Sequence, residues 1–166
     1  TAAAVTYNAT TRVATLNPTP TLTQAAVYTA TLRGGTSDPR VKDLAGNALA
    51  ANVTWSFTIA PDITPPTVTA TSPANVATGV SRTANVTATF SEAMDASTMS
   101  TSTVELRDPS GAVVPAVVTY SATNRRVTLN PTPTLAALTT YTATVRGGTT
   151  DPRVKDLAGN ALVATR

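Results

Sequence analysis

Apolar and hydroxyl side chains alternate with a period of two along much of the chain. Within residues 53–59, Trp55, Phe57 and Ile59 are separated from one another by Ser or Thr. Such alternation predicts β-strands that place one face on a core and the other in solvent. The same pattern predicts six further strands, at residues 68–70, 86–90, 104–106, 118–120, 127–129 and 141–145.

Short segments rich in Pro, Gly, Asn and Asp separate these strands and have the composition of tight turns. They lie at residues 108–111, 130–133, 147–148 and 158–160. The one exception is residues 91–95, a short stretch with helical potential in which Ser91 is placed to act as the N-cap. Seven short strands in about 100 residues predict an all-β, immunoglobulin-like antiparallel β-sandwich. In such a fold Trp55 is expected in the core.

An internal repeat organises the sequence. Residues 38–49 are identical to residues 151–162, which gives a period of about 113 residues (151 minus 38). The repeat predicts the C-terminal part of one Ig-like unit at residues 1–60, a Pro-rich linker at 61–66, and a second unit at 67–166. The second unit stops before a counterpart of the Trp55 strand, so we expect the chain to be part of a longer array. Prolines in the linker would make such an array semi-rigid.

Composition excludes most catalytic chemistry. The chain has no His and no Cys, so the usual nucleophile-activating bases and the usual zinc, haem and iron–sulfur ligands are missing. We therefore expect a protein that is not an enzyme. The net charge of +3 comes from scattered residues of both signs, which predicts no nucleic-acid binding. No apolar run has the length of a membrane span.

Several ordered motifs together resemble the bacterial Ig-like domain of the SbsA type. They are 64–68 (TPPTV), 72–74 (SPA), 86–95 (VTATFSEAMD), 141–145 (YTATV), 155–162 (KDLAGNAL) and, in the first copy, 55–58 (WSFT). The resemblance implies a secreted or cell-surface bacterial protein in which such domains occur in tandem without catalytic residues. It thus implies a structural module of a surface protein, stalk or fibre, whose partners are neighbouring Ig-like repeats of the same chain or fibre, joined in one version by strand addition.

One polar constellation, present in both copies, has the oxygen ligands that Ca²⁺ prefers. The alternative is structural, because an Asp and an Asn around a Gly also form a tight turn by accepting hydrogen bonds from backbone N–H groups. No other cofactor is expected. The candidate calcium ligands are Asp38, Asp43 and Asn47 in the first copy and Asp151, Asp156 and Asn160 in the second.

Other candidate sites have simpler structural explanations. Glu92 and Asp95 form an acidic pair of the kind glycosidases use, but the sequence shows no accompanying cleft, so a solvated turn is favoured. Ser91 and Ser110 have no His to activate them. The Gly pairs at 34–35 and 147–148 lack the Lys of a phosphate-binding loop and are expected in turns.

The main alternative function is an adhesive or carbohydrate-binding accessory module of a secreted enzyme. Such a module needs exposed aromatic or polar patches, and its candidates are four tyrosines and the repeated basic residues. The alternation with Thr predicts that the tyrosines point inward, and the basic residues are expected to be solvated loop charges. These residues are Tyr7, Tyr28, Tyr120 and Tyr141, with Arg33, Arg40, Lys42, Arg146, Arg153 and Lys155.

Overall fold

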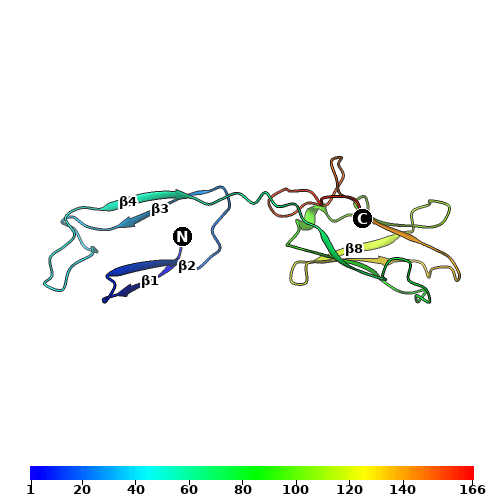
Figure 1. The fold of residues 1–166 in the computed structure, drawn as a ribbon, viewed down its shortest axis with the longest axis horizontal. Coiled ribbons are helices and arrows are strands. Elements are labelled where there is room, and N and C mark those ends of the chain that lie inside the picture. The colour runs from blue at the N-terminus through cyan, green and yellow to red at the C-terminus, as the bar shows by residue number, and fades with distance from the viewer. The chain divides into compact units, whose positions relative to one another are not determined.

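A computed structural model describes residues 1–166, which divide into two compact units, Thr1–Asp62 and Ile63–Arg166. Both units consist of antiparallel strands (Figure 1). The structure contains no helix with the length and apolarity needed to cross a bilayer.

The second unit is a sandwich of two sheets. A four-stranded antiparallel sheet has the order β5-β6-β9-β8, and a two-stranded sheet pairs β10 with β7. This arrangement follows constant-type immunoglobulin domains, in which strands one, two, five and four form one sheet and strands three and six lie in the other. The six strands predicted here are confirmed: β5 (Val68–Ser72), β6 (Val86–Phe90), β7 (Val104–Arg107), β8 (Ala116–Ser121), β9 (Arg126–Pro131) and β10 (Thr142–Val145).

The short helical segment differs from the prediction. A single 3-10 turn, η1 (Ala96–Thr98), follows residues 91–95 instead of occupying them. Asp95 is its N-cap and accepts a hydrogen bond from the backbone N–H of Ser97. The predicted cap, Ser91, instead accepts a hydrogen bond from the backbone N–H of Thr67 (3.0 Å). A carboxylate within reach of the first free N–H groups therefore sets the start of the turn.

The core of the second unit lies between its two sheets. Inward positions of β6 and β9 alternate with outward ones, so Phe90, Val127 and Leu129 are almost fully buried. Val154 and Leu162, which follow β10 in the chain, close the same core. Outward positions are largely occupied by Thr, whose β-branched side chain favours extended backbone without adding apolar surface.

The first unit contains two strand pairs. Its strands are β1 (Ala3–Asn8), β2 (Val13–Pro18), β3 (Val27–Leu32) and β4 (Val53–Thr58). β1 pairs with β2 in the register Ala3↔Pro18, which is the register Ala116↔Pro131 of β8 and β9 displaced by one period. β3 pairs with β4. Residues 1–62 thus repeat the later strands of the sandwich and contain no counterparts of β5, β6 and β7.

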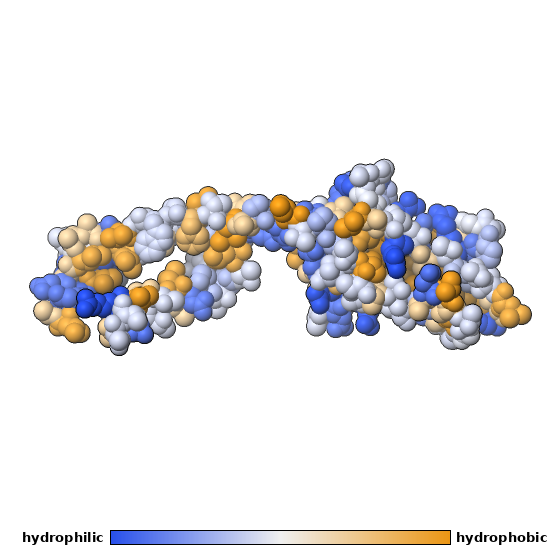
Figure 2. Space-filling view, in the orientation of Figure 1, coloured by the Kyte–Doolittle hydropathy of each residue, from blue (hydrophilic) through white to orange (hydrophobic).

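The prediction that Trp55 lies in a core is wrong for this chain. Trp55 is 49% exposed and its neighbour Phe57 is 43% exposed. The inward prediction also fails for Tyr7, which is 66% exposed. The alternation was correctly interpreted as strand, but a strand face is buried only when a second sheet packs on it. Figure 2 shows the resulting hydrophobic surface on the first unit.

We expect Phe90→Ala to lower the free energy of unfolding of the second unit by about 3 to 5 kcal/mol, because it empties the centre of the core. Trp55→Ala is the matched control, with an expected cost of about 1 kcal/mol or less for a half-exposed side chain. Urea denaturation of the 166-residue chain measures both. Equal losses for the two variants would contradict the assignment of the core.

Candidate functional site

The loop 156–160 of the second unit is a turn closed by one aspartate. Asp156 Oδ1 accepts hydrogen bonds from the backbone N–H groups of Ala158 (2.8 Å) and Asn160 (2.8 Å). Asp156 Oδ2 accepts one from the side-chain amide of Asn160 (2.9 Å). Gly159 has a φ of 93°, a left-handed conformation that favours glycine. Asp156 is 2% exposed, so its charge is compensated by these bonds within the fold.

The first unit contains the same turn in an exposed setting. Asp43 Oδ1 accepts from the backbone N–H groups of Ala45 (2.9 Å) and Asn47 (2.8 Å), and Asp43 Oδ2 from the amide of Asn47 (2.9 Å). The side-chain hydrogen bond from Asn47, followed by those from backbone N–H groups, holds the pKa of Asp43 below its usual value. The identical geometry in both units shows that the turn forms from its local sequence.

The remaining candidate ligand of each copy pairs with basic side chains. Asp38 lies 3.0 Å from Arg40 Nε and 3.1 Å from Lys42 Nζ. Asp151 repeats this pairing with Arg153 and Lys155 at 3.0 and 3.3 Å. Hydrogen bonding to Lys155, then the positive charges of Arg153 and Lys155, lower the pKa of Asp151.

The structure therefore brings together two of the three candidate calcium ligands in each copy. The Asp and Asn of each turn bond to one another, whereas Asp38 and Asp151 bond to cationic groups. These contacts favour the structural role of the turn over coordination of a cation. Calcium binding by Asp38, Asp43, Asn47, Asp151, Asp156 and Asn160 stays a prediction.

The surroundings of the acidic pair Glu92 and Asp95 differ from those expected for a solvated turn. Asp95 Oδ1 accepts from the backbone N–H (2.9 Å) and the hydroxyl (2.7 Å) of Ser97. These two bonds lower the pKa of Asp95, the side-chain bond having the larger effect. A carboxylate oxygen of Glu92 lies within 4.8 Å of one of Asp156, a residue far away in the sequence. Docking of the two loops creates this proximity, which local sequence patterns do not reveal.

An ionic cluster around the buried carboxylate of Glu105 in the second unit was not predicted. Glu105, on β7, is 8% exposed and accepts hydrogen bonds from Arg107 Nε (3.1 Å) and Nη2 (3.0 Å) and from Arg146 Nη2 (3.1 Å). Hydrogen bonding to Arg107 outweighs the cost of burial and lowers the pKa of Glu105. The signal available in the sequence was a lone Glu between Val104 and Leu106, followed by Arg107.

The hydroxyl and glycine candidates occupy turns, as expected. Ser110 donates to Asp108 Oδ1 (2.6 Å) inside a loop. Gly148 has a φ of 83°, and a Cβ at Gly147 would lie 2.7 Å from the backbone oxygens of Leu162 and Ala164. A glycine is thus required at position 147, because the backbone of residues 162–164 approaches it too closely for a side chain.

Three of the four tyrosines use their hydroxyl groups as internal acceptors. Tyr120 accepts from the backbone N–H of Met94 (2.8 Å), and its ring meets Phe90 edge-on at 6.4 Å between centroids. Tyr28 and Tyr141 accept from Thr23 (2.9 Å) and Ala136 (3.0 Å) in corresponding loops. Tyr7 is the exposed counterpart of Tyr120, since the first unit has no strand corresponding to β6.

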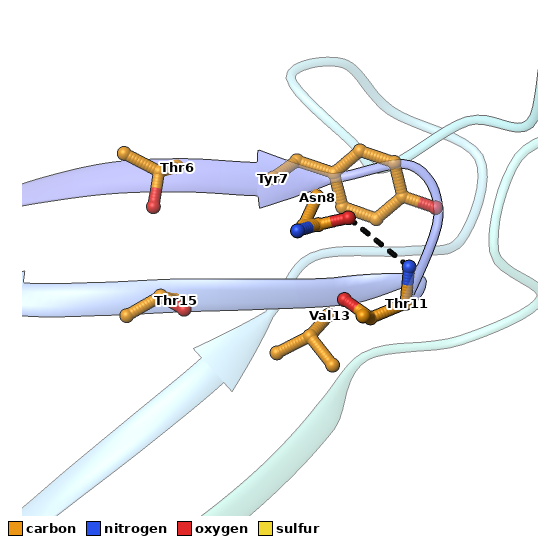
Figure 3. A pocket seen from close by; sticks show the side chains of 6 residues that line it. All are labelled: Thr6, Tyr7, Asn8, Thr11, Val13 and Thr15. Atoms are coloured by element: carbon orange, nitrogen blue, oxygen red, sulfur yellow. Dashed lines mark hydrogen bonds between the residues drawn. The ribbon is translucent and has the colours of Figure 1, made fainter.

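Tyr7 also lines an open hollow of about 600 Å³ at the tip of the β1–β2 hairpin. Figure 3 shows Asn8 turned across this tip, where its Oδ1 accepts the backbone N–H of Thr11 (3.0 Å). A smaller hollow of about 370 Å³ in the second unit lies beside Glu105, Val104 and Leu129. Neither hollow has convergent titratable groups of the kind expected at a catalytic centre.

Comparison with known proteins gives one family. A family model described as a bacterial Ig-like domain matches residues 1–59 and again residues 62–166. A search of curated proteins gave no match.

We expect Asp156→Ala to destabilise the second unit by about 1 to 3 kcal/mol, because it removes the buried carboxylate that accepts three hydrogen bonds and closes the turn. Asp43→Ala removes the same three hydrogen bonds from an exposed turn, where water replaces them, and is expected to cost less. Denaturant unfolding of both variants tests the structural role. Calcium titration of the unmutated chain tests the alternative, which is calcium binding by the turn. Calcium binding predicts that added calcium raises the melting temperature and that Asp156→Ala removes this rise.

We also expect acid sensitivity from Glu105. Its folded-state pKa is lowered, so its contribution to stability is complete above the unfolded value of about 4.3 and is lost as pH falls through the folded value. Glu105→Gln should therefore flatten the dependence of the melting temperature on pH below about 4.3. If the melting temperature of Glu105→Gln depends on pH below about 4.3 as strongly as that of the unmutated chain, the cluster around Glu105 does not contribute to acid sensitivity.

Proposed function

Because the chain belongs to the bacterial Ig-like domain family, we propose that it is a non-catalytic structural segment of an extracellular bacterial surface protein, stalk or fibre. The observation that carries the proposal is the tandem match, in which two successive stretches of one chain fit the same domain model. A protein built by repeating one sandwich gains length with each repeat, so its function is to set the length and shape of the assembly.

The chemistry of the described side chains supports this role. Two polar groups that the sequence offers as candidate sites form internal bonds, since Asp156 closes a turn and Asp95 caps η1, and the unpredicted Glu105 binds two arginines. Groups engaged in this way stabilise loops and sheets. Outward positions rich in Thr, as on β5, present a polar surface suited to an extracellular setting.

An adhesive or carbohydrate-binding module is the second candidate, and Tyr7 is the observation that favours it. The side chain is 66% exposed next to an open hollow. Its counterpart Tyr120, however, packs on Phe90 and accepts a hydrogen bond. Residues 1–62 contain no counterpart of β6, which accounts for the exposure of Tyr7, and the structural role remains the preferred proposal.

Electron microscopy of the intact protein tests the structural role. We expect rods or fibres whose spacing corresponds to one sandwich per repeat. Isolated globular particles without an extended region would contradict the proposal.

A glycan array separates the two candidates. The structural role predicts no specific binding by the 166-residue chain and no difference between that chain and Tyr7→Ala. Binding that Tyr7→Ala abolishes, while the equivalent change at Thr10 near the same hairpin tip leaves it intact, would establish the adhesive alternative instead.

A further inference from the structure

Hydrogen bonds hold the first part of the Pro-rich segment 61–66 to the first unit. Just beyond β4, the backbone N–H of Ile59 donates to the backbone oxygen of Ala26 (3.0 Å). In the same loop as Ala26, Gln24 Oε1 accepts the backbone N–H of Asp62 (3.2 Å). The loop between β2 and β3 therefore follows the chain past the end of β4 and fastens it as far as Asp62.

Packing and hydrogen bonds hold the last part of the same segment to the second unit. The side chain of Pro66 is fully buried, and its backbone oxygen accepts the N–H of Val163 (3.1 Å). The backbone N–H of Thr67 donates to Ser91 Oγ (3.0 Å), and the N–H of Ser91 donates to the backbone oxygen of Thr67 (2.9 Å). The chain is thus fixed again from Pro66 onward, and residues 63–65 lie between the two attachments.

Proline restricts two of the three residues in this interval. The ring of Pro65 fixes its own φ, and the ring of Pro66 limits the ψ of Pro65 to extended values. Pro65 imposes the same limit on the ψ of Thr64. Ile63 does not precede a proline, and its side chain is 79% exposed. The backbone torsions of Ile63 therefore have the greatest freedom in the interval.

We propose that Ile63 is the hinge between the two units and that Gln24 is the positioning residue that ends the hinge on the side of the first unit. Without the bond from Gln24, the torsions of residues 60–62 would add to those of Ile63. A joint confined to one residue has two freely rotating backbone bonds. The two units accordingly keep a narrower range of relative orientations than a six-residue linker would permit.

This inference rests on the proposed structural function only for its purpose, since a segment that sets length and shape needs joints of limited flexibility. The hydrogen bonds and the prolines restrict the chain whatever its function is. The hinge can therefore be wrong while the proposed function holds, and electron microscopy of the intact protein tests only the function.

The repeat shows that the loop holding Asp62 does not need Gln24 for its own fold. One period later, the residue corresponding to Gln24 is Ala137. The residues that follow these two have the same left-handed backbone, with a φ of 55° at Ala25 and 56° at Leu138. Gln24→Ala should therefore remove the bond to Asp62 without altering the loop.

Spin labels test the hinge directly, because the chain has no Cys of its own. Thr10→Cys and Thr123→Cys place one label in each unit, at the tips of the β1–β2 and β8–β9 hairpins. Double electron–electron resonance then measures the distribution of distances between the labels. We expect Ile63→Gly to broaden this distribution about twofold, since glycine reaches positive as well as negative φ. Ile63→Pro should narrow it, since proline fixes φ.

Ile63→Val is the control for these two variants. It keeps a branched apolar side chain of similar size and should leave the width of the distribution unchanged. The same width in the glycine variant, the proline variant and the unmutated labelled chain would overturn Ile63 as the hinge.

Gln24→Ala tests the positioning residue in the same labelled chain. We expect the amide of Asp62 to exchange hydrogen up to about tenfold faster, as expected for the loss of one net hydrogen bond, and the label distribution to broaden. Exchange at Ile59, which bonds to a backbone oxygen, should change little. Thr21→Ala, in the same loop, is the matched control. Unaltered exchange at Asp62, or faster exchange there with an unchanged label distribution, would overturn the assignment of Gln24.

Discussion

Burial of a strand face against a second sheet is the constraint on which the rest of this structure depends. Phe90, Val127 and Leu129 are buried because β6 and β9 face β7 and β10 across one core. The first unit repeats β8, β9 and β10 with closely similar sequences but has no strands corresponding to β5–β7. Several of its large apolar side chains, such as Leu16 and Trp55, are exposed in the described residues. The two units form an internal comparison in which nearly the same sequence is buried once and exposed once.

The polar residues follow from the same constraint. The turn closed by Asp156 and the turn closed by Asp43 have the same hydrogen bonds, yet only Asp156 is buried. In the second unit the backbone N–H of Asp95 donates to the backbone oxygen of Lys155 (2.9 Å), which joins the loop after β6 to the segment that enters the turn. The candidate ligands Asp156 and Asn160 bond to one another within this turn, so their contacts stabilise the loop that the backbone bond of Asp95 holds in place.

The strands were predictable because they depend on local alternation. Every strand of the second unit is recognisable from its own residues. The pairing register of β1 with β2 equals that of β8 with β9 displaced by one period, as the sequence repeat indicates. Burial was less predictable, since the orientation of Trp55 and Tyr7 specifies a face but not what packs on it. The proximity of Glu92 to Asp156 and the binding of Glu105 to Arg146 join residues far apart in the chain, and no local pattern encodes them. The cap of η1 was misplaced because Ser91 and Asp95 are both good N-cap residues and the path of the backbone decides between them.

Amide hydrogen exchange at the matched residues Thr15 and Thr128 tests the central claim most directly. The two threonines occupy equivalent positions in β2 and β9, and by the alternation of each antiparallel ladder their N–H groups bond to Thr6 of β1 and Thr119 of β8. If a facing sheet determines stability, the amide of Thr128 exchanges only through unfolding of the second unit, whereas that of Thr15 exchanges orders of magnitude faster through local opening. Equal protection of the two amides would contradict the account, because it would mean that the strand pairs of the first unit are stable without a second sheet.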